Sequence, residues 1–221
     1  MDIDVLAWLN GKLSTPKMVA PEDALPGRPT PILDPIPVHE VLGLPLDEVP
    51  EGAEVAYFAL GCYWGEERMF WQTPGVLNTA VGFAGGFTPN PTYAESCTGK
   101  TGHTETVQVV FDPKRVSYDD LLELFWENHD PTQLNRQGND NGTQYRSALF
   151  PVDDTQREAA ERSLASFQQR LADQGFGTIT TEISQDRPFY YADREHQQYL
   201  HKNPGGYCPN HATGVKCGPD A

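Results

Sequence analysis

The stretch LGCYWGEE, residues 60–67, places a cysteine where it can do chemistry. An apolar run at 55–60 leads into Gly61 and Cys62, and a helical pattern follows until Pro74 stops it. A cysteine at a helix N-terminus meets unpaired N–H groups and the positive end of the helix dipole, and both favour the thiolate. We interpret Cys62 as a nucleophile, with a buried structural cysteine at a strand end as the alternative.

Two further cysteines lie in the glycine-rich segment GGYCPNHATGVKCG near the C-terminus, which we expect to be mobile. One reactive cysteine and two mobile ones suit a redox relay, in which a sulfenic acid forms, a second thiol condenses with it and a third exchanges. A static Cys208–Cys217 disulfide is an alternative that a reducing compartment disfavours. A zinc site of Cys208, His211 and Cys217, completed by His196 or His201, has an uncommon spacing for this metal.

The composition limits the partners and the compartment. A chain of 221 residues suits one domain with extensions and is long enough to bury a core. A net charge of −15 argues against nucleic acid or an anionic membrane surface as a partner, and no stretch is apolar enough to span a bilayer. The acidic N-terminus lacks the features of a signal peptide, so we expect a cytoplasmic protein.

The elements that must position Cys62 are predicted in the order β-α-β-β-α-β. Strands are expected over 55–60, 76–86, 105–112, 144–150 and 178–184, and helices from Cys62 to Pro74, from Ser117 to Pro131 and over 153–175. The segment 87–103 is expected to be a loop. This order predicts an α+β fold with a ferredoxin-like, split β-α-β core, in which helices cover a mixed sheet.

The chain divides into three segments. Residues 1–52 are rich in proline and are predicted to form an extended arm, either loose or laid over the domain. Residues 53–186 form the predicted catalytic domain. Residues 187–221 are a coil-rich tail of the same domain, with a short helix near 193–202 and the last two cysteines.

Six blocks of the sequence resemble the peptide methionine sulfoxide reductases of the A type. They are GCYWGEE, GGFTPNPTY, TGHTETV, FWENHDPTQ, RQGNDNGTQYRS and HQQYLHKNPGGYC, in this order over roughly residues 55–210. The resemblance implies reduction of the S epimer of methionine sulfoxide, free or in oxidised proteins, without cofactor or metal, and regeneration by thioredoxin. The family usually has phenylalanine where Tyr63 stands, which leaves the fine substrate preference open.

The resemblance assigns five residues to the reduction step. Cys62 attacks the sulfoxide sulfur, and Glu105 protonates the sulfoxide oxygen. Tyr93 and Tyr145 hydrogen-bond that oxygen, and Asp140 helps to hold the substrate or a water molecule. The chemistry agrees, because the oxygen leaves only when an acid protonates it, and a carboxyl is an acid at neutral pH only if burial raises its pKa.

The resemblance assigns four more residues to substrate binding and recycling. Tyr63 and Trp64 cradle the methyl group of the substrate. Cys208 is the resolving cysteine, and Cys217 is the second recycling cysteine. We interpret Cys97 as a packing thiol near the substrate loop, because nothing near it in the sequence would activate it.

Two other classes of protein fit part of the sequence. A cysteine hydrolase would pair Cys62 with His103 or His129 and would not need the tail cysteines. A zinc-dependent interaction module would be built on the tail. A flavin or nicotinamide enzyme is unsupported, because the glycine pattern of a dinucleotide site is absent. Nothing suggests an obligate oligomer, so we expect a monomer.

Overall fold

The computed structural model describes residues 15–185, 188–207 and 211–218. Its strands are β1 (Glu54–Ala59), β2 (Val76–Ala84), β3 (Thr104–Phe111), β4 (Arg136–Gln137), β5 (Asp140–Asn141), β6 (Ala148–Leu149), β7 (Glu182–Ile183) and β8 (Tyr190–Tyr191). Its helices are η1 (Pro21–Asp23), α2 (Tyr63–Trp71), α3 (Tyr93–Cys97), α4 (Tyr118–Glu127), η2 (Thr143–Tyr145), α5 (Asp154–Asp173) and α6 (Tyr199–Lys202).

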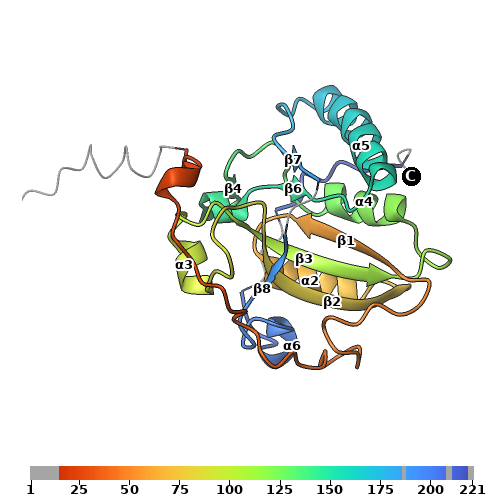
Figure 1. Cartoon of the computed structure of the whole chain (residues 1–221). Helices are drawn as coiled ribbons and strands as arrows, with labels where there is room; N and C mark the ends of the chain where they lie inside the picture. Colours follow the sequence, from red (N-terminus) through yellow and green to blue (C-terminus); the bar gives the residue numbers. More distant parts are fainter. Residues whose placement is uncertain (1–14, 186–187, 208–210, 219–221) are drawn as a thin grey trace, which may run out of the picture.

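A six-stranded sheet in the order β7-β6-β1-β3-β2-β8 forms the centre of the molecule (Figure 1). Its inner strands β6-β1-β3-β2 are antiparallel, with β3 inserted between the two strands that α2 connects. This is the predicted ferredoxin-like topology. Strand β7 adds parallel to β6, so the sheet is mixed, as expected. Both the fold class and the order β-α-β-β-α-β are therefore confirmed.

Helices α2 and α4 cover one face of the sheet, and the alternation of side chains along the strands explains why. Phe58 on β1 points to this face and stacks on Phe70 of α2, with ring centroids 4.9 Å apart. Ser117 caps α4 in a capping box with Asp120, as predicted. Helix α5 packs outside α4, where Trp126 stacks on Phe167 with a centroid distance of 5.6 Å. The site-bearing junction before α2 thus rests on a rigid core.

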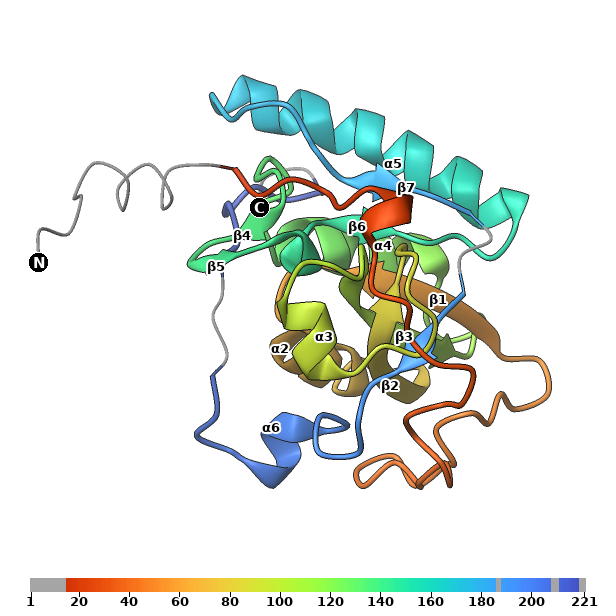
Figure 2. The ribbon, with the colours of Figure 1, turned by 60° about the vertical axis from the view of Figure 1, so that its left-hand side comes forward.

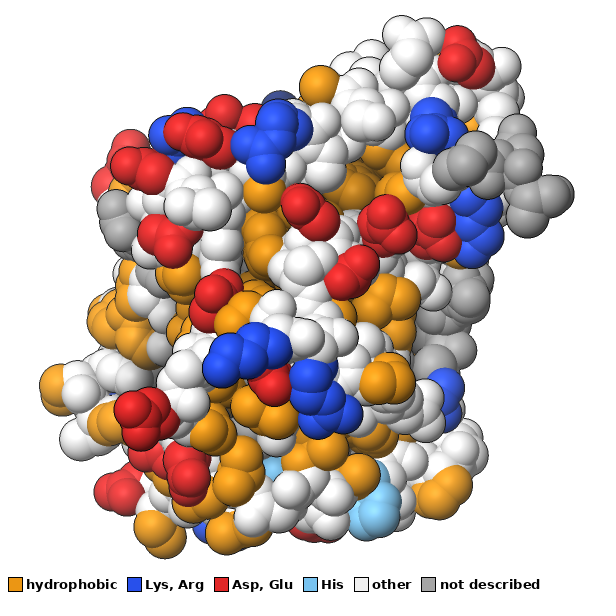
Figure 3. All heavy atoms as spheres, turned by 90° about the vertical axis from the view of Figure 1, so that its right-hand side faces the viewer, with side chains coloured by type: hydrophobic (Ala, Val, Ile, Leu, Met, Phe, Trp, Pro, Cys, Tyr) orange, Lys and Arg blue, Asp and Glu red, His pale blue; other side chains and the backbone are white. Residues whose placement is uncertain are grey.

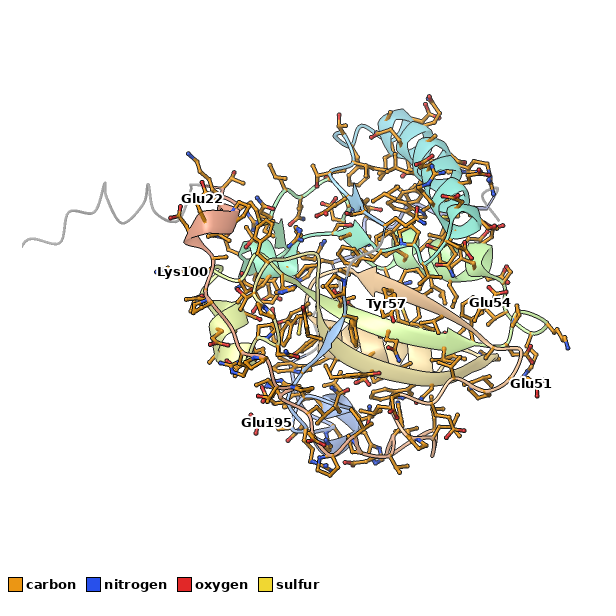
Figure 4. All side chains as sticks on the ribbon, viewed as in Figure 1. Glu22, Glu51, Glu54, Tyr57, Lys100 and Glu195 are labelled. Atoms are coloured by element: carbon orange, nitrogen blue, oxygen red, sulfur yellow. The ribbon has the colours of Figure 1, made fainter. Side chains whose placement is uncertain are left out.

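The opposite face of the sheet is covered by the described part of the N-terminal arm. Leu46 is fully buried, and its carbonyl accepts a hydrogen bond from Gln108 of β3 at 3.2 Å. The arm then reaches α3, where Arg28 pairs with Glu95 at 2.7 Å. Figure 2 shows the arm passing in front of the sheet beside α3, and Figure 4 shows Tyr57 on this same face. The arm therefore packs on the domain.

Several local structures differ from those expected. The segment 144–150 contains the end of η2 and the short strand β6, because the Gln144 and Arg146 carbonyls accept hydrogen bonds from the Thr104 hydroxyl instead of a neighbouring strand. The strand expected over 178–184 is likewise reduced to β7. The expected loop at 87–103 contains α3, which begins with a capping box of Thr92 and Glu95. Strand β8, which pairs with the edge of β2, was not expected at all.

On the face shown in Figure 3, Lys and Arg side chains stand among Asp and Glu side chains and do not gather into one basic patch. Among the described residues, no helix combines the length and the apolar character needed to cross a membrane.

Candidate active site

Cys62 lies at the junction between β1 and α2, where it is the N-cap residue of the helix. The chain turns sharply at Gly61, whose φ is +132°, and a side chain there would stand 2.9 Å from Gln137. Glycine is therefore required for this turn. Cys62 is half-buried and borders a cavity of about 590 Å³ between α2, α4 and the β4–β5 hairpin. The predicted position at the N-terminus of a helix is observed.

The surroundings of Cys62 favour the thiol and not the expected thiolate. Burial raises the pKa of the thiol, and the nearby carboxyl of Glu105 raises it further. The backbone N–H of Trp64 lowers that pKa, as expected for a helix N-terminus, but burial outweighs it. The local sequence predicted the helical contribution and missed the larger, tertiary one. Cys62 therefore rests as a thiol.

Glu105 is the second residue of β3, close to Cys62, and is 1% exposed. Its Oε2 accepts a hydrogen bond from the backbone N–H of Tyr63 at 3.1 Å, which ties it to the first turn of α2. Burial raises the pKa of Glu105 to about 8, the Tyr63 N–H lowers it, and the charge of Asp140 raises it. The carboxyl is therefore mostly protonated at neutral pH, as an acid catalyst must be.

Aromatic rings form a cage beside Cys62. Trp64 stacks on Tyr199 at a centroid distance of 4.0 Å, and Tyr93 stacks on His196 at 4.1 Å. The indole N–H of Trp64 donates to Nδ1 of His196 at 3.3 Å, which holds the two pairs together. Sequence reasoning found Trp64 and Tyr93 but missed His196 and Tyr199. The run HQQYLH did contain them, but only the fold brings the tail to α2 and α3.

Tyr63 is fully buried below this cage, with its ring 6.0 Å from that of Phe83. Its hydroxyl is buried and has no hydrogen-bond partner within the described residues. The hydroxyl therefore makes no bond to nearby backbone in the described structure, and it lies inside the core instead of at the edge of the substrate pocket. The ring supports the cage from inside the core.

Asp140 and Tyr145 approach the site from the polar segment after α4. Both are partly buried. Burial is the largest cause that raises the pKa of Tyr145, and the charges of Glu105, Asp140 and Cys62 raise it further. Asp140 accepts hydrogen bonds from the hydroxyl of Tyr207 at 3.1 and 3.2 Å. The tail is thus attached beside the site at Tyr207. Cys208 itself lies outside the described residues.

Cys97 is exposed, so its interpretation as a packing thiol is wrong. It ends the short helix α3, and a hydrogen bond joins its thiol to the side chain of Tyr93. Burial of part of the thiol raises its pKa, and the Tyr93 contact lowers it. Cys97 is therefore a surface thiol next to the cage.

The two histidines considered as hydrolase bases are engaged elsewhere. His103 binds the Gly86 N–H and the Thr88 carbonyl through its two ring nitrogens. His129 binds the Phe125 carbonyl and the Ser147 hydroxyl in the same way, both at 2.7 Å. Burial lowers the pKa of each to about 4. Neither imidazole is available to Cys62 as a base.

Cys217 lies on α4 and not at Cys62. Its backbone N–H donates to Oε1 of Glu127 at 2.8 Å, and Lys216 pairs with Oε2 of the same carboxylate at 2.7 Å. Val215 is 1% exposed, and Arg170 donates to the Gly218 carbonyl at 2.9 Å. Burial and the charge of Glu127 raise the pKa of the Cys217 thiol to about 12. The expected mobility of the tail is therefore wrong for residues 215–218.

Replacing Glu127 with alanine should release Cys217 from α4. The substitution removes two of the contacts that hold this end of the tail. We therefore expect iodoacetamide to label Cys217 about tenfold faster, because the lost free energy of one charge-assisted hydrogen bond corresponds to roughly a factor of ten. Mass spectrometry of timed digests measures this rate. The exposed neighbour Glu123 gives the matched control for charge: its carboxylate also raises the pKa of Cys217, but only Glu127 accepts the Cys217 N–H, so Glu123→Ala should speed labelling less than Glu127→Ala. Equal labelling of Cys217 in both variants would contradict the anchoring.

No group of three or more His, Cys, Asp or Glu side chains in residues 15–185, 188–207 and 211–218 is arranged to hold a metal ion. Of the histidines considered as zinc ligands, His196 is part of the cage, His201 lies on α6 and His211 packs on Gly138. Cys217 is held on α4, as described above. The described residues of the proposed zinc site therefore lie in different parts of the structure and do not form one group.

The site consists of a half-buried thiol, a buried carboxylic acid and an aromatic cage, and the comparisons match the chain to known enzymes. The family model for peptide methionine sulfoxide reductase matches residues 54–216. The enzyme named peptide methionine sulfoxide reductase MsrA from Salmonella arizonae is 58% identical over 92% of this chain and 96% of its own, and its namesake from Escherichia coli is 56% identical over the same shares.

Solved structures agree with this match. Methionine sulfoxide reductase A of Corynebacterium diphtheriae superposes with a TM-score of 0.83 at 50% identity, over 93% of this chain and 100% of that one. The reduced form of Mxr1 from Saccharomyces cerevisiae has a TM-score of 0.67 at 33% identity, over 76% and 96% of the two chains. The chain belongs to the peptide methionine sulfoxide reductase family of oxidoreductases.

Proposed function

We propose that the protein reduces the S epimer of methionine sulfoxide, free or in oxidised proteins, through attack of the Cys62 sulfur on the sulfoxide sulfur. The observation that carries this proposal is a thiol at the N-cap of α2 beside a fully buried carboxyl that is protonated at neutral pH. The attack forms a bond between Cys62 and the substrate sulfur, transfers the oxygen to Cys62 as a sulfenic acid and releases methionine.

Glu105 supplies the proton that the sulfoxide oxygen needs. The pKa of about 8 makes this carboxyl an acid at pH 7 that is still strong enough to donate. Before it donates, protonated Glu105 carries no charge, so it does not repel a developing thiolate as the ionised carboxyl would. As the Cys62 sulfur attacks, the thiol gives up its own proton, which replaces the proton that Glu105 donates. The hydroxyls of Tyr93 and Tyr145 are suited to hold the oxygen, because they donate hydrogen bonds without carrying charge.

The cage binds the methyl group of the substrate. Trp64, packed on Tyr199 and hydrogen-bonded to His196, presents a fixed aromatic surface beside Cys62, and Tyr63 supports it from the core. A flat apolar wall at a fixed distance from the thiol favours a small methyl group over larger substituents. The hydroxyl of Tyr63 is buried without a hydrogen-bond partner among the described residues, so the ring and not the hydroxyl contributes to the cage.

The oxidised Cys62 is then recycled by the tail. Cys208 attacks the sulfenic acid, Cys217 exchanges with the resulting disulfide, and thioredoxin restores the two thiols. The Tyr207–Asp140 hydrogen bond supports this order, because it attaches the residue before Cys208 next to the site. Cys217 can react with this disulfide only after its backbone has left Glu127, so release of the tail from Glu127 precedes the disulfide exchange.

Serine at both tail positions should stop the enzyme after one turnover. With thioredoxin as the reductant, Cys208→Ser/Cys217→Ser still yields one equivalent of methionine, since Cys62 and Glu105 are intact, and then stalls as the sulfenic acid. Methionine counted by chromatography over time, with thiols counted by mass spectrometry, measures this. The single variant Cys97→Ser is the matched control and should keep turning over. Sustained turnover of the double variant would refute the relay, because thioredoxin would then reduce the oxidised Cys62 directly.

A further inference from the structure

A second buried carboxyl, that of Glu66, borders Cys62 and has no part in the mechanism above. It lies in the first turn of α2 and is 9% exposed. The Leu60 N–H donates to its carboxyl, while Oε2 is buried and has no hydrogen-bond partner anywhere in the described structure. An unpaired buried carboxyl oxygen is costly and therefore points to a group that binds it during the reaction.

Glu66 lies beside the cavity of about 590 Å³ that Cys62 also borders. None of Trp64, Tyr93 and Tyr145 contributes to this cavity, so it is separate from the aromatic cage. A second unpaired buried atom, Nε2 of His211, lies in the same wall. Cys62 is thus placed between the cage, with Glu105, and a polar cavity with Glu66.

The second half of the proposed reaction needs an acid. When a thiol attacks the Cys62 sulfenic acid, a sulfur–sulfur bond forms, the sulfur–oxygen bond breaks, and its electron pair leaves with the oxygen. That oxygen needs a proton to depart as water. The thiol attacks in line with the breaking bond, so the oxygen leaves on the side away from the attacker. Methionine vacates the cage after the first step, and a thiol that attacked from there would drive the oxygen towards the cavity.

We infer that Glu66 donates this proton, as the acid that releases water from the Cys62 sulfenic acid during attack by the second thiol. The inference rests on the proposed function. The sulfenic oxygen reaches the cavity by rotation about the Cβ–Sγ bond, and the cavity receives the water. The attacking thiol gives up its own proton, which restores the Glu66 acid through that water. The reaction therefore consumes one thiol and one sulfenic acid and yields one disulfide and one water.

The charge state of Glu66 agrees with this role. Burial raises the pKa of Glu66 well above its ordinary value, and the charge of Glu105 raises it further. The other titratable or charged groups around it are Cys62, Arg68 on α2 and His211 of the tail. Burial therefore favours the protonated, uncharged form of Glu66, the form that can donate a proton.

The test separates the two halves of the reaction. Full-length protein and Glu66→Gln are mixed with methionine sulfoxide without thioredoxin, and methionine and dimedone-trapped Cys62 sulfenic acid are followed by quenched flow and mass spectrometry. We expect methionine to form at a similar rate in both, and the sulfenic acid to last about 100-fold longer in Glu66→Gln at pH 7.5. The same delay is expected in a Cys208→Ser background, where added dithiothreitol supplies the attacking thiol.

The pH dependence distinguishes an acid from a structural residue. The ratio of the two decay rates should fall towards one as pH rises through the pKa of Glu66, and also at acidic pH, where solvent supplies protons. Cys62, Glu105, Arg68 and His211 are present in both proteins, so the ratio reports Glu66. Glu67→Gln is the matched control, because the neighbouring carboxyl binds Gln198 on the other side of α2 and should change stability without prolonging the sulfenic acid.

The outcomes are separable. Equally fast decay of the sulfenic acid in Glu66→Gln overturns the inference, and so does a delay that is the same at every pH. A wild-type protein that forms no methionine refutes the proposed function instead. A pH-dependent delay confined to the second step supports both.

Discussion

Replacing Cys62 with serine is expected to abolish methionine sulfoxide reduction. Serine keeps the N-cap position of α2 and the size of the side chain, but its hydroxyl neither ionises near neutral pH nor accepts the oxygen from a sulfoxide. We expect the rate to fall by at least about 1,000-fold, as when other enzymes lose their nucleophile. A single-turnover assay that counts methionine from one equivalent of sulfoxide measures this.

The control for Cys62→Ser is the exposed thiol of Cys97. Both variants leave three cysteines, so a difference between them reports position and not the number of thiols. Cys97→Ser should retain most of the wild-type rate, and its melting temperature should match that of Cys62→Ser within a few degrees. A Cys62→Ser protein that retains even a tenth of the rate would remove Cys62 from the role of nucleophile.

Glu105→Gln should slow the reduction step by about 100-fold at neutral pH, which is the usual size of a lost general acid. Glutamine can still accept the Tyr63 N–H through its amide oxygen, so α2 and Cys62 stay in place. The loss should be smaller at acidic pH, where solvent protonates the sulfoxide oxygen. Single-turnover formation of methionine between pH 5 and 9 measures both effects.

The pH dependence of the wild-type protein follows from the raised pKa of Glu105. The acid form is needed and predominates below a pKa of about 8, so the rate should fall as pH rises through this value. Glu105→Gln should lose this descending limb, whereas Glu67→Gln, a buried carboxyl bonded to Gln198, should keep it. An unchanged single-turnover rate of Glu105→Gln at neutral pH would contradict the role of Glu105 as the acid.

The same raised pKa has a consequence for stability. Glu105 has a pKa of about 8 in the folded protein and an ordinary value of 4.5, so the folded state binds more protons between these values. The stability that this group contributes is complete below about pH 4.5 and is lost as pH rises towards 8. Glu105→Gln should therefore gain stability over the wild type as pH rises, which thermal unfolding at several pH values measures.

The sequence determined the main elements because their signals are local. The apolar residues of β1 and β3, the Ser117 capping box and the stops after α2 and α4 are local signals of a few residues each, and the ferredoxin-like order followed from them. Gly61 before Cys62 likewise fixed the cysteine at a helix N-terminus. The predictions failed where short segments take their structure from distant partners, as at β8, which forms only because β2 offers an edge.

The chemistry of the site was decided by the tertiary structure. Local sequence predicts the Trp64 N–H beside the Cys62 thiol, but the burial that raises the pKa of Cys62, Glu66 and Glu105 comes from β1, β3 and α4 packing around them. His196 and Tyr199 join the cage because the tail folds back onto α2. Cys217 rests on Glu127, about ninety residues earlier in the chain. Burial and charge depend on every neighbour in space, and the sequence lists neighbours only along the chain.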